Sequence, residues 1–180
     1  MNINRSKCVG RFIIFLSLLL IAGAATLAQD VSYNVAPGTD FTKYKTYKWV
    51  TIDGAEVPDQ IVDQQIKQSI DTQLAAKGFT KTDGDKADLY VGYQISISQE
   101  RQWNAYGGGI GFRGMGTATS STIQIGTLAF DVYDSAAKQL IWRGSATKTL
   151  NPPKDPDKKQ RNLDKAVAKL LKDFPPPNKK

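Results

Sequence analysis

The sequence predicts an α+β fold, a two-layer sandwich in which two amphipathic helices cover one face of a mostly antiparallel sheet of about five strands. Several segments alternate apolar and polar residues, as half-buried strands do. Two other segments repeat apolar residues every three to four positions, which is typical of helices with one buried face. The order along the chain is two strands, a helix, three strands and a second helix, which fits one two-layer domain.

The first half of the domain is predicted to hold two strands and a helix. Residues 31–35 and 46–50 alternate and are followed by turn residues. The helix should begin after Pro58 and Asp59 and should end before Gly78. Its apolar stripe recurs every four residues and consists of Val62, Ile66, Ile70 and Leu74.

The second half is predicted to hold three strands and the last helix. Residues 89–97 alternate without interruption. In the strand that starts near Thr122, the apolar residues change from odd to even positions at 126–127, which predicts a bulge or bend there. A strand from Leu140 should pair with it as a hairpin. Asp157 should cap the last helix, whose apolar positions are Leu163, Val167, Leu170, Leu171 and Phe174.

The first 28 residues have the three-part layout of a secretory signal peptide, with basic residues, an apolar run over 12–21 and small residues at the end. We expect cleavage between Ala28 and Gln29, because the apolar run is short for a membrane span, and retention as an uncleaved membrane anchor is the alternative. Cys8 precedes the apolar core, so it cannot become the first mature residue, and we expect no lipid anchor. These features predict an exported protein of the periplasm. The chain is then divided into the signal over 1–28, one domain over 29–174 and a Pro/Lys tail over 175–180.

The net charge of +7 is unevenly distributed. The leader carries +3, residues 154–180 carry +5, and the body between them carries −1. A near-neutral body argues against a nucleic-acid partner. The last helix is a candidate for peripheral contact with an anionic membrane. The alternative is that its apolar face packs on the domain while its lysines are solvated. The basic face consists of Lys158, Lys165, Lys169 and Lys172.

The composition excludes several kinds of site. The chain has no His and a single Cys, so an imidazole base, a His-ligated metal and a Ser-His-Asp or Cys-His site are all excluded. The acids near 83–88 and 131–134 fall in predicted turns, where Asp is ordinary. We therefore expect no cofactor, no metal and no catalytic residue. The favoured function is a non-enzymatic binding or assembly module of the envelope, and an envelope hydrolase using carboxylates or a Ser/Lys pair is the alternative.

Residues 102–118 are predicted to form a glycine-rich loop between two strands. Residues 109–114 match the dinucleotide-binding pattern letter for letter, but the strand that must precede it and the helix that must follow it are missing, so the match is a coincidence. A loop of this length is usually functional or disordered. It could contact an envelope protein, a glycan or a lipid surface, or it could be a solvated hairpin tip. The candidate contact residues are Trp103, Tyr106, Phe112 and Arg113.

Five short motifs together resemble the uncharacterised bacterial family of exported proteins and lipoproteins known as domain of unknown function four-one-three-six. These motifs occupy residues 40–49, 74–79, 87–93, 126–134 and 140–144. The resemblance implies a small α+β domain in the cell envelope, but it carries over no catalytic residue. Many members have a lipidation Cys directly after the signal, which this sequence lacks. Within the motifs, Trp49 and Trp142 fall on inward strand faces, and Gly144 predicts the close approach of a helix or a bend.

Overall fold

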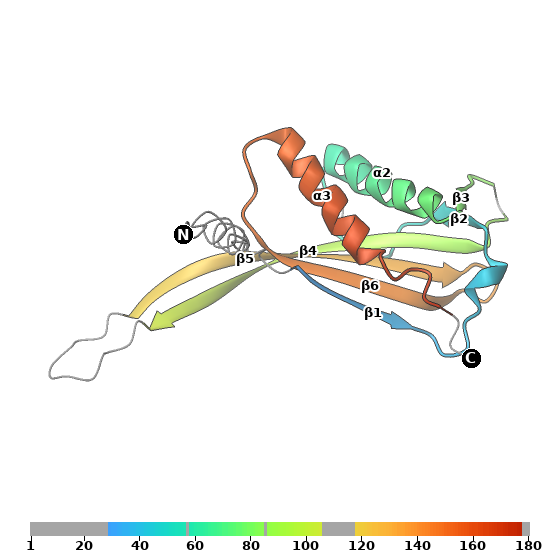
Figure 1. Cartoon of the computed structure of the whole chain (residues 1–180), viewed down its shortest axis with the longest axis horizontal. Helices are drawn as coiled ribbons and strands as arrows, with labels where there is room; N and C mark the ends of the chain where they lie inside the picture. Colours follow the sequence, from blue (N-terminus) through green and yellow to red (C-terminus); the bar gives the residue numbers. More distant parts are fainter. Residues whose placement is uncertain (1–28, 57, 85, 106–117, 178–180) are drawn as a thin grey trace, which may run out of the picture.

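The described part of the chain folds into one mixed sheet of six strands with two helices on one face. The computed structural model describes residues 29–56, 58–84, 86–105 and 118–177, and its two layers are visible in Figure 1. In chain order the elements are β1 (Asp30–Val35), a short 3₁₀ turn (Phe41–Lys43), β2 (Thr46–Trp49), α2 (Gln60–Ala76), β3 (Thr80–Lys81), β4 (Leu89–Ala105), β5 (Ala118–Asp134), β6 (Gln139–Leu150) and α3 (Pro156–Leu170). The predicted α+β class is confirmed.

The strand order is β1-β6-β5-β4-β2-β3. The pairs β1–β6, β6–β5 and β5–β4 are antiparallel, whereas β2 runs parallel to both β4 and β3. Parallel neighbours need a long crossover connection, and α2 supplies it between β2 and β3. The sixth strand, which the sequence pattern did not predict, is the two-residue β3 at this edge.

Local sequence fixes both helix starts. The side chain of Asp59 accepts hydrogen bonds from the backbone N–H groups of Ile61 and Val62, so α2 begins where predicted. Asp155 caps α3 by accepting from the N–H of Asp157, and Pro156 occupies the first turn. The predicted cap at Asp157 is therefore wrong by two residues, because the Asp-Pro pair places the extended residue before the proline.

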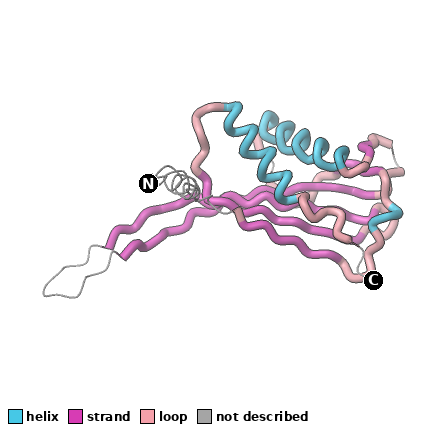
Figure 2. The backbone as a smooth tube through the Cα atoms, in the orientation of Figure 1, coloured by secondary structure: helices cyan, strands magenta, loops and turns pink. Residues whose placement is uncertain are grey.

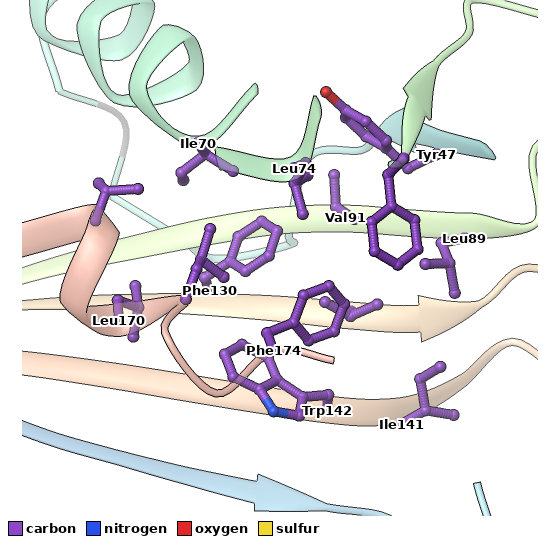
Figure 3. Packing of buried hydrophobic residues seen from close by; sticks show 14 of the residues in the cluster. Tyr47, Ile70, Leu74, Leu89, Val91, Phe130, Ile141, Trp142, Leu170 and Phe174 are labelled. Carbon is purple, nitrogen blue, oxygen red and sulfur yellow. The ribbon is translucent and has the colours of Figure 1, made fainter. Parts of the chain in front are cut away.

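Aliphatic and aromatic side chains fill the core between the helices and the sheet, as Figure 3 shows. Trp142 is 1% exposed, and its ring lies 4.9 Å from that of Phe174 and 6.2 Å from that of Phe130. Trp49 also faces inward and meets Phe130 and Tyr93 edge to ring. The inward placement predicted for both tryptophans is confirmed.

Gly144 lets α3 approach the sheet. A Cβ atom at this position would clash with the ring of Trp142 and would lie 2.9 Å from Cδ1 of Leu170 on α3. The predicted close approach of a helix at Gly144 is therefore confirmed. Its cause is the Trp142 ring, which lies across the glycine and beneath the helix.

The β4–β5 hairpin is longer and more regular than predicted. Its 17 residue pairs continue in register from Leu89–Asp134 to Ala105–Ala118, and Figure 2 shows both strands running well beyond the helices. The predicted bulge at 126–127 is wrong, because the one register shift of β5 lies between Val132 and Tyr133, opposite β6. The predicted loop over 102–118 is also too long, since residues 102–105 belong to β4 and residue 118 belongs to β5. Residues 106–117, with the dinucleotide-like glycines, lie outside the described residues.

Substitution of Gly144 by Ala should lower the free energy of unfolding by about 1–3 kcal/mol, because the added methyl group displaces the Trp142 ring from beneath α3. Urea denaturation measures the change. Gly84→Ala is the matched control, because its Cβ would meet only the Thr82 hydroxyl, at 3.3 Å, and its cost should stay below about 0.5 kcal/mol. Equal effects of the two substitutions would contradict the packing role of Gly144.

Candidate binding groove

The sheet is longer than the helices that cover it. A strand of 17 residues at about 3.3 Å per residue spans roughly 56 Å. Helices of 17 and 15 residues at 1.5 Å per residue span only about 22–26 Å. The helices therefore cover the inner part of the β4–β5 hairpin and leave the outer part uncovered (Figure 1). At the boundary between the two parts, apolar side chains on the helix-facing side of the sheet are no longer covered by a helix.

Two rows of cross-strand neighbours form the floor of a groove at this boundary. The inner row runs from Ile95 on β4 through Leu128 on β5 to Ala146 on β6. The next row outward follows the same order and consists of Ile97, Gly126 and Lys148. Ile97 is 62% exposed although it shares the face of the buried Leu89 and Val91. The floor is thus the outward continuation of the core.

The helices and the connection to α3 supply the other walls. Ile66 contributes from α2, Leu163 and Ala166 contribute from α3, and residues 150–153 close the end where β6 leaves the sheet. The cavity measures about 450 Å³. This volume lies within the range of about 300–1,000 Å³ found for small-molecule sites.

The charges of the groove are of one sign. Among the described residues that line it, Lys148 and Lys159 are the charged ones, and there is no acid. Neither lysine side chain has a carboxylate partner among the described residues. The remaining polar positions carry amides or hydroxyls, at Gln29, Ser96, Thr127, Thr149, Asn151 and Asn162. The groove is therefore apolar with a cationic contribution.

Gly126 shapes the floor. A Cβ atom at this position would lie 2.8 Å from Cδ2 of Leu150 on the neighbouring strand, so the glycine gives the Leu150 side chain room to lie across it. The chain thus uses the missing side chain for close packing, as interior strand glycines often do. The change of apolar phase at this point marks the start of the uncovered part of the sheet, where the register itself continues unchanged.

The opposite face of the sheet carries an ion pair between a buried carboxylate, Asp131, and an exposed guanidinium, Arg143. Asp131 is fully buried between the inward-facing Phe130 and Val132 and points away from the helices. Nε and Nη2 of Arg143 each donate to one oxygen of Asp131 at 2.5 Å, and Nε2 of Gln94 donates at 3.1 Å. The carboxylate is the main reason that the pKa of Arg143 is raised. The fully bonded Asp131 has a structural role in joining β4, β5 and β6.

Of the acids predicted to lie in turns, Asp88 and Asp134 bind turn residues, whereas the prediction is wrong for Asp131, which lies within β5. Oδ1 of Asp134 accepts hydrogen bonds from the N–H groups of Ala136 and Ala137, and its Oδ2 accepts from the Tyr44 hydroxyl at 2.6 Å. Asp88 accepts from the N–H groups of Lys45 and Thr46 at 2.8 Å each. The Tyr44 hydroxyl, followed by the backbone donors, lowers the pKa of Asp134 to about 2. Hydrogen bonds from the same kind of backbone donor lower the pKa of Asp88.

Two further acids fasten α2 to the sheet. Oδ1 of Asp71 accepts from the Tyr47 hydroxyl and from the indole N–H of Trp49, both at 2.8 Å. About two turns earlier on the same face of α2, Asp63 accepts a hydrogen bond from the Tyr93 hydroxyl at 2.6 Å. Burial, followed by the bond to Asp63 or Asp71, raises the pKa of both tyrosines well above the ordinary value. These hydroxyls stay protonated and act as structural donors.

Of the candidate site residues that the sequence singled out and that the structure describes, Gln29 is the one that lines the groove. Gln29 is the first described residue and lines the groove, whereas Ala28 lies outside the described residues. Trp103 lies on β4 in register with Ser120, and Tyr106, Phe112 and Arg113 lie outside the described residues. The basic residues Lys158, Lys165, Lys169 and Lys172 are all exposed on or just after α3.

The apolar side of α3 is occupied by the domain itself. Val167 and Leu170 are buried against the sheet, together with Leu171 just after the helix. Any membrane contact of this helix would therefore be electrostatic, through its exposed lysines. Among the described residues there is no cluster of three metal-ligating side chains. Within the same part of the chain, no helix is long and apolar enough to cross a membrane.

Sequence reasoning missed the groove because it is made by tertiary structure. One local signal was present: Lys148 follows Trp142, Gly144 and Ala146 at the same inward phase of its strand. A lysine at an inward position indicates that the cover ends there.

Asp134→Asn should weaken the dependence of the free energy of unfolding on pH in the acid range. The folded pKa of about 2 lies below the ordinary value of 3.8, so the ionised carboxylate stabilises the fold above about pH 5 and loses that effect as the pH falls from about 4 to 2. We expect a loss on the order of 1–2 kcal/mol near neutral pH and almost none at pH 2, from urea unfolding across the pH range. Exposed Asp53→Asn is the control. A pH-independent loss would contradict the assignment.

Solved structures of other proteins are similar to this chain to different degrees. A PDZ domain protein from Parabacteroides distasonis matches with a TM-score of 0.56 and 15% identity, over 83% of this chain and 36% of that one. The chain thus spans about a third of that protein, and at this identity the likeness concerns the fold alone. The PelC dodecamer from Paraburkholderia phytofirmans matches with a TM-score of 0.49 and 14% identity, over 80% of this chain and 95% of that one. No curated protein matches the sequence.

The family described as Domain of unknown function (DUF4136) matches residues 31–176. This range runs from β1 to the residues that follow α3, and it includes both helices and the whole described hairpin. The chain therefore belongs to the DUF4136 family, as the resemblance of its five motifs predicted.

Proposed function

We propose that this protein is a non-enzymatic binding module of the bacterial cell envelope, which holds an apolar ligand in the groove at the root of the β4–β5 hairpin. The groove itself carries the proposal. It exposes Ile97 and keeps a cavity of about 450 Å³ beside a core that is filled by aliphatic and aromatic side chains. Apolar surface left in water costs about 25 cal/mol for each Å². A ligand that covers this surface recovers that free energy.

The leader supports the envelope location. Basic residues, an apolar run and small residues end at Ala28, directly before the residue that borders the groove. Cleavage there would leave the groove beside the new N-terminus in the periplasm. Cys8 would leave with the leader, so attachment by a lipid on that residue is not part of the proposal.

The arrangement of the acids supports binding over hydrolysis. Asp88 and Asp134 border a shared concavity of about 460 Å³, but both accept hydrogen bonds that hold turns. Their pKa values are lowered, whereas a carboxyl that serves as a general acid needs a raised pKa. Ser135 in the same place donates its hydroxyl to the carbonyl of Ala87. These groups are committed to the fold.

The test is uptake of a neutral, environment-sensitive probe, N-phenyl-naphthylamine, by the exported protein purified from the periplasm of an expressing bacterium. The fluorescence of the probe should rise with the wild-type protein. Ala166→Phe fills the groove from α3 and should weaken uptake by about tenfold, which corresponds to about 1.4 kcal/mol. Ala76→Phe, at an exposed position at the end of α2, is the matched control.

A second variant guards against a folding defect in Ala166→Phe. Ile97→Gln changes a residue that is 62% exposed, so it should leave the melting temperature nearly unchanged while it weakens uptake. Mass spectrometry of the same sample should find Gln29 at the N-terminus. Equal uptake by the wild-type protein and both groove variants would show that the probe binds elsewhere, and the proposal would then be wrong.

A further inference from the structure

We infer that the ligand of the groove is a fatty acid of about a dozen carbons, whose acyl chain lies along the strand floor and whose carboxylate is directed toward Lys148 and Lys159. The inference rests on the proposed function, and it adds the chemical class of the ligand. It follows from three properties of the groove, which are its size, the state of its backbone groups and the sign of its charge.

The volume of the groove suits a single acyl chain. A water molecule takes about 30 Å³ in the liquid, and a methylene group is of similar size, so a cavity of 450 Å³ accepts on the order of a dozen carbons. An α-helix with its side chains is about 10–12 Å wide, and a cavity of this volume does not hold one. The occupant is therefore narrow and extended.

The backbone groups of the floor exclude an extended peptide. β5 is an interior strand at this point, because it pairs with β4 and with β6 through both rows of the floor, whereas β4 has no paired strand on its other side beyond Val91 among the described residues. The N–H and C=O groups of β5 are engaged in these two ladders, and those on the free edge of β4 point sideways in the plane of the sheet, not into the groove. A peptide laid over them would bury its own backbone groups without partners, which is costly. An acyl chain has no polar groups to satisfy along its length.

The charge selects the head group. Lys148 is half-buried on the helix-facing side of β6, where its aliphatic stem lies along the apolar floor, and its ammonium group has no carboxylate partner among the described residues. Lys159 lies in the first turn of α3, above the end of the groove where residues 150–153 leave the sheet. With two cations and no lining acid, the groove favours an anionic head over a neutral or cationic one.

The experiment measures displacement of the neutral probe from the exported, processed protein by dodecanoate and by its uncharged methyl ester. Dodecanoate should bind more tightly than the ester by about fivefold or more, since two ion pairs contribute. In the double variant Lys148→Met, Lys159→Gln the ratio of the two affinities should fall to about one. Lys165→Gln is the control, because this exposed lysine of α3 lies outside the groove lining, and it should keep the wild-type ratio.

The outcomes separate this inference from the proposed function. If the probe enters the groove but dodecanoate and its ester displace it equally, or neither displaces it, the fatty acid is wrong while a groove for another apolar ligand stands. If a synthetic peptide of the leader, residues 12–28, displaces the probe more strongly than dodecanoate does, the occupant is an apolar peptide and the inference is overturned. If the probe does not enter at all, the proposed function fails as well.

Discussion

The unbroken pairing of β4 with β5 is the constraint on which the rest of the architecture depends. Its 17 residue pairs continue without a register shift, so the hairpin forms one stiff ribbon whose faces stay constant along its length. β6 extends that ribbon on one side, and the parallel β2 extends it on the other. Since both helices are less than half as long as the ribbon, any residue pattern would leave part of it uncovered. The position of the groove follows from this mismatch in length.

The second constraint is the depth at which α3 lies on the sheet. Trp142 fills the space beneath the helix, and Gly144 removes the side chain that would hold the helix away. Phe174, after the helix, closes the same cluster. These contacts secure the C-terminal half of α3, whereas its first turns extend over the uncovered rows of the sheet. The same helix therefore completes the core at one end and forms the roof of the groove at the other.

The sequence predicted those features for which burial determines the pattern of apolar and polar residues. Both helices, the alternation of 89–97 and the inward tryptophans follow from which side chains meet the core. The outer hairpin was missed because residues 98–101 are exposed, and a strand that buries neither face shows no alternation. Its existence depends on backbone hydrogen bonds to the partner strand, which a residue pattern does not report. The groove was missed for a related reason, because it lies between segments far apart in the sequence and only the phase of Lys148 pointed to it.

The residues chosen for the uncovered rows distinguish a binding surface from a merely exposed strand. A strand that meets water on this face needs β-propensity, which Thr supplies as well as Ile does, and the outer hairpin does use Thr and Ser at exposed positions such as 120–122. In the rows that border the helices the chain instead places Ile97, which is 62% exposed, beside Ile95 and Leu128, which pack partly against the core, and it adds a lysine on the same face. Apolar surface kept in water destabilises the free protein, and the same surface strengthens binding to a ligand that covers it. A cation beside that surface, with no acid to neutralise it, gives the ligand a preferred orientation as well as a place to bind.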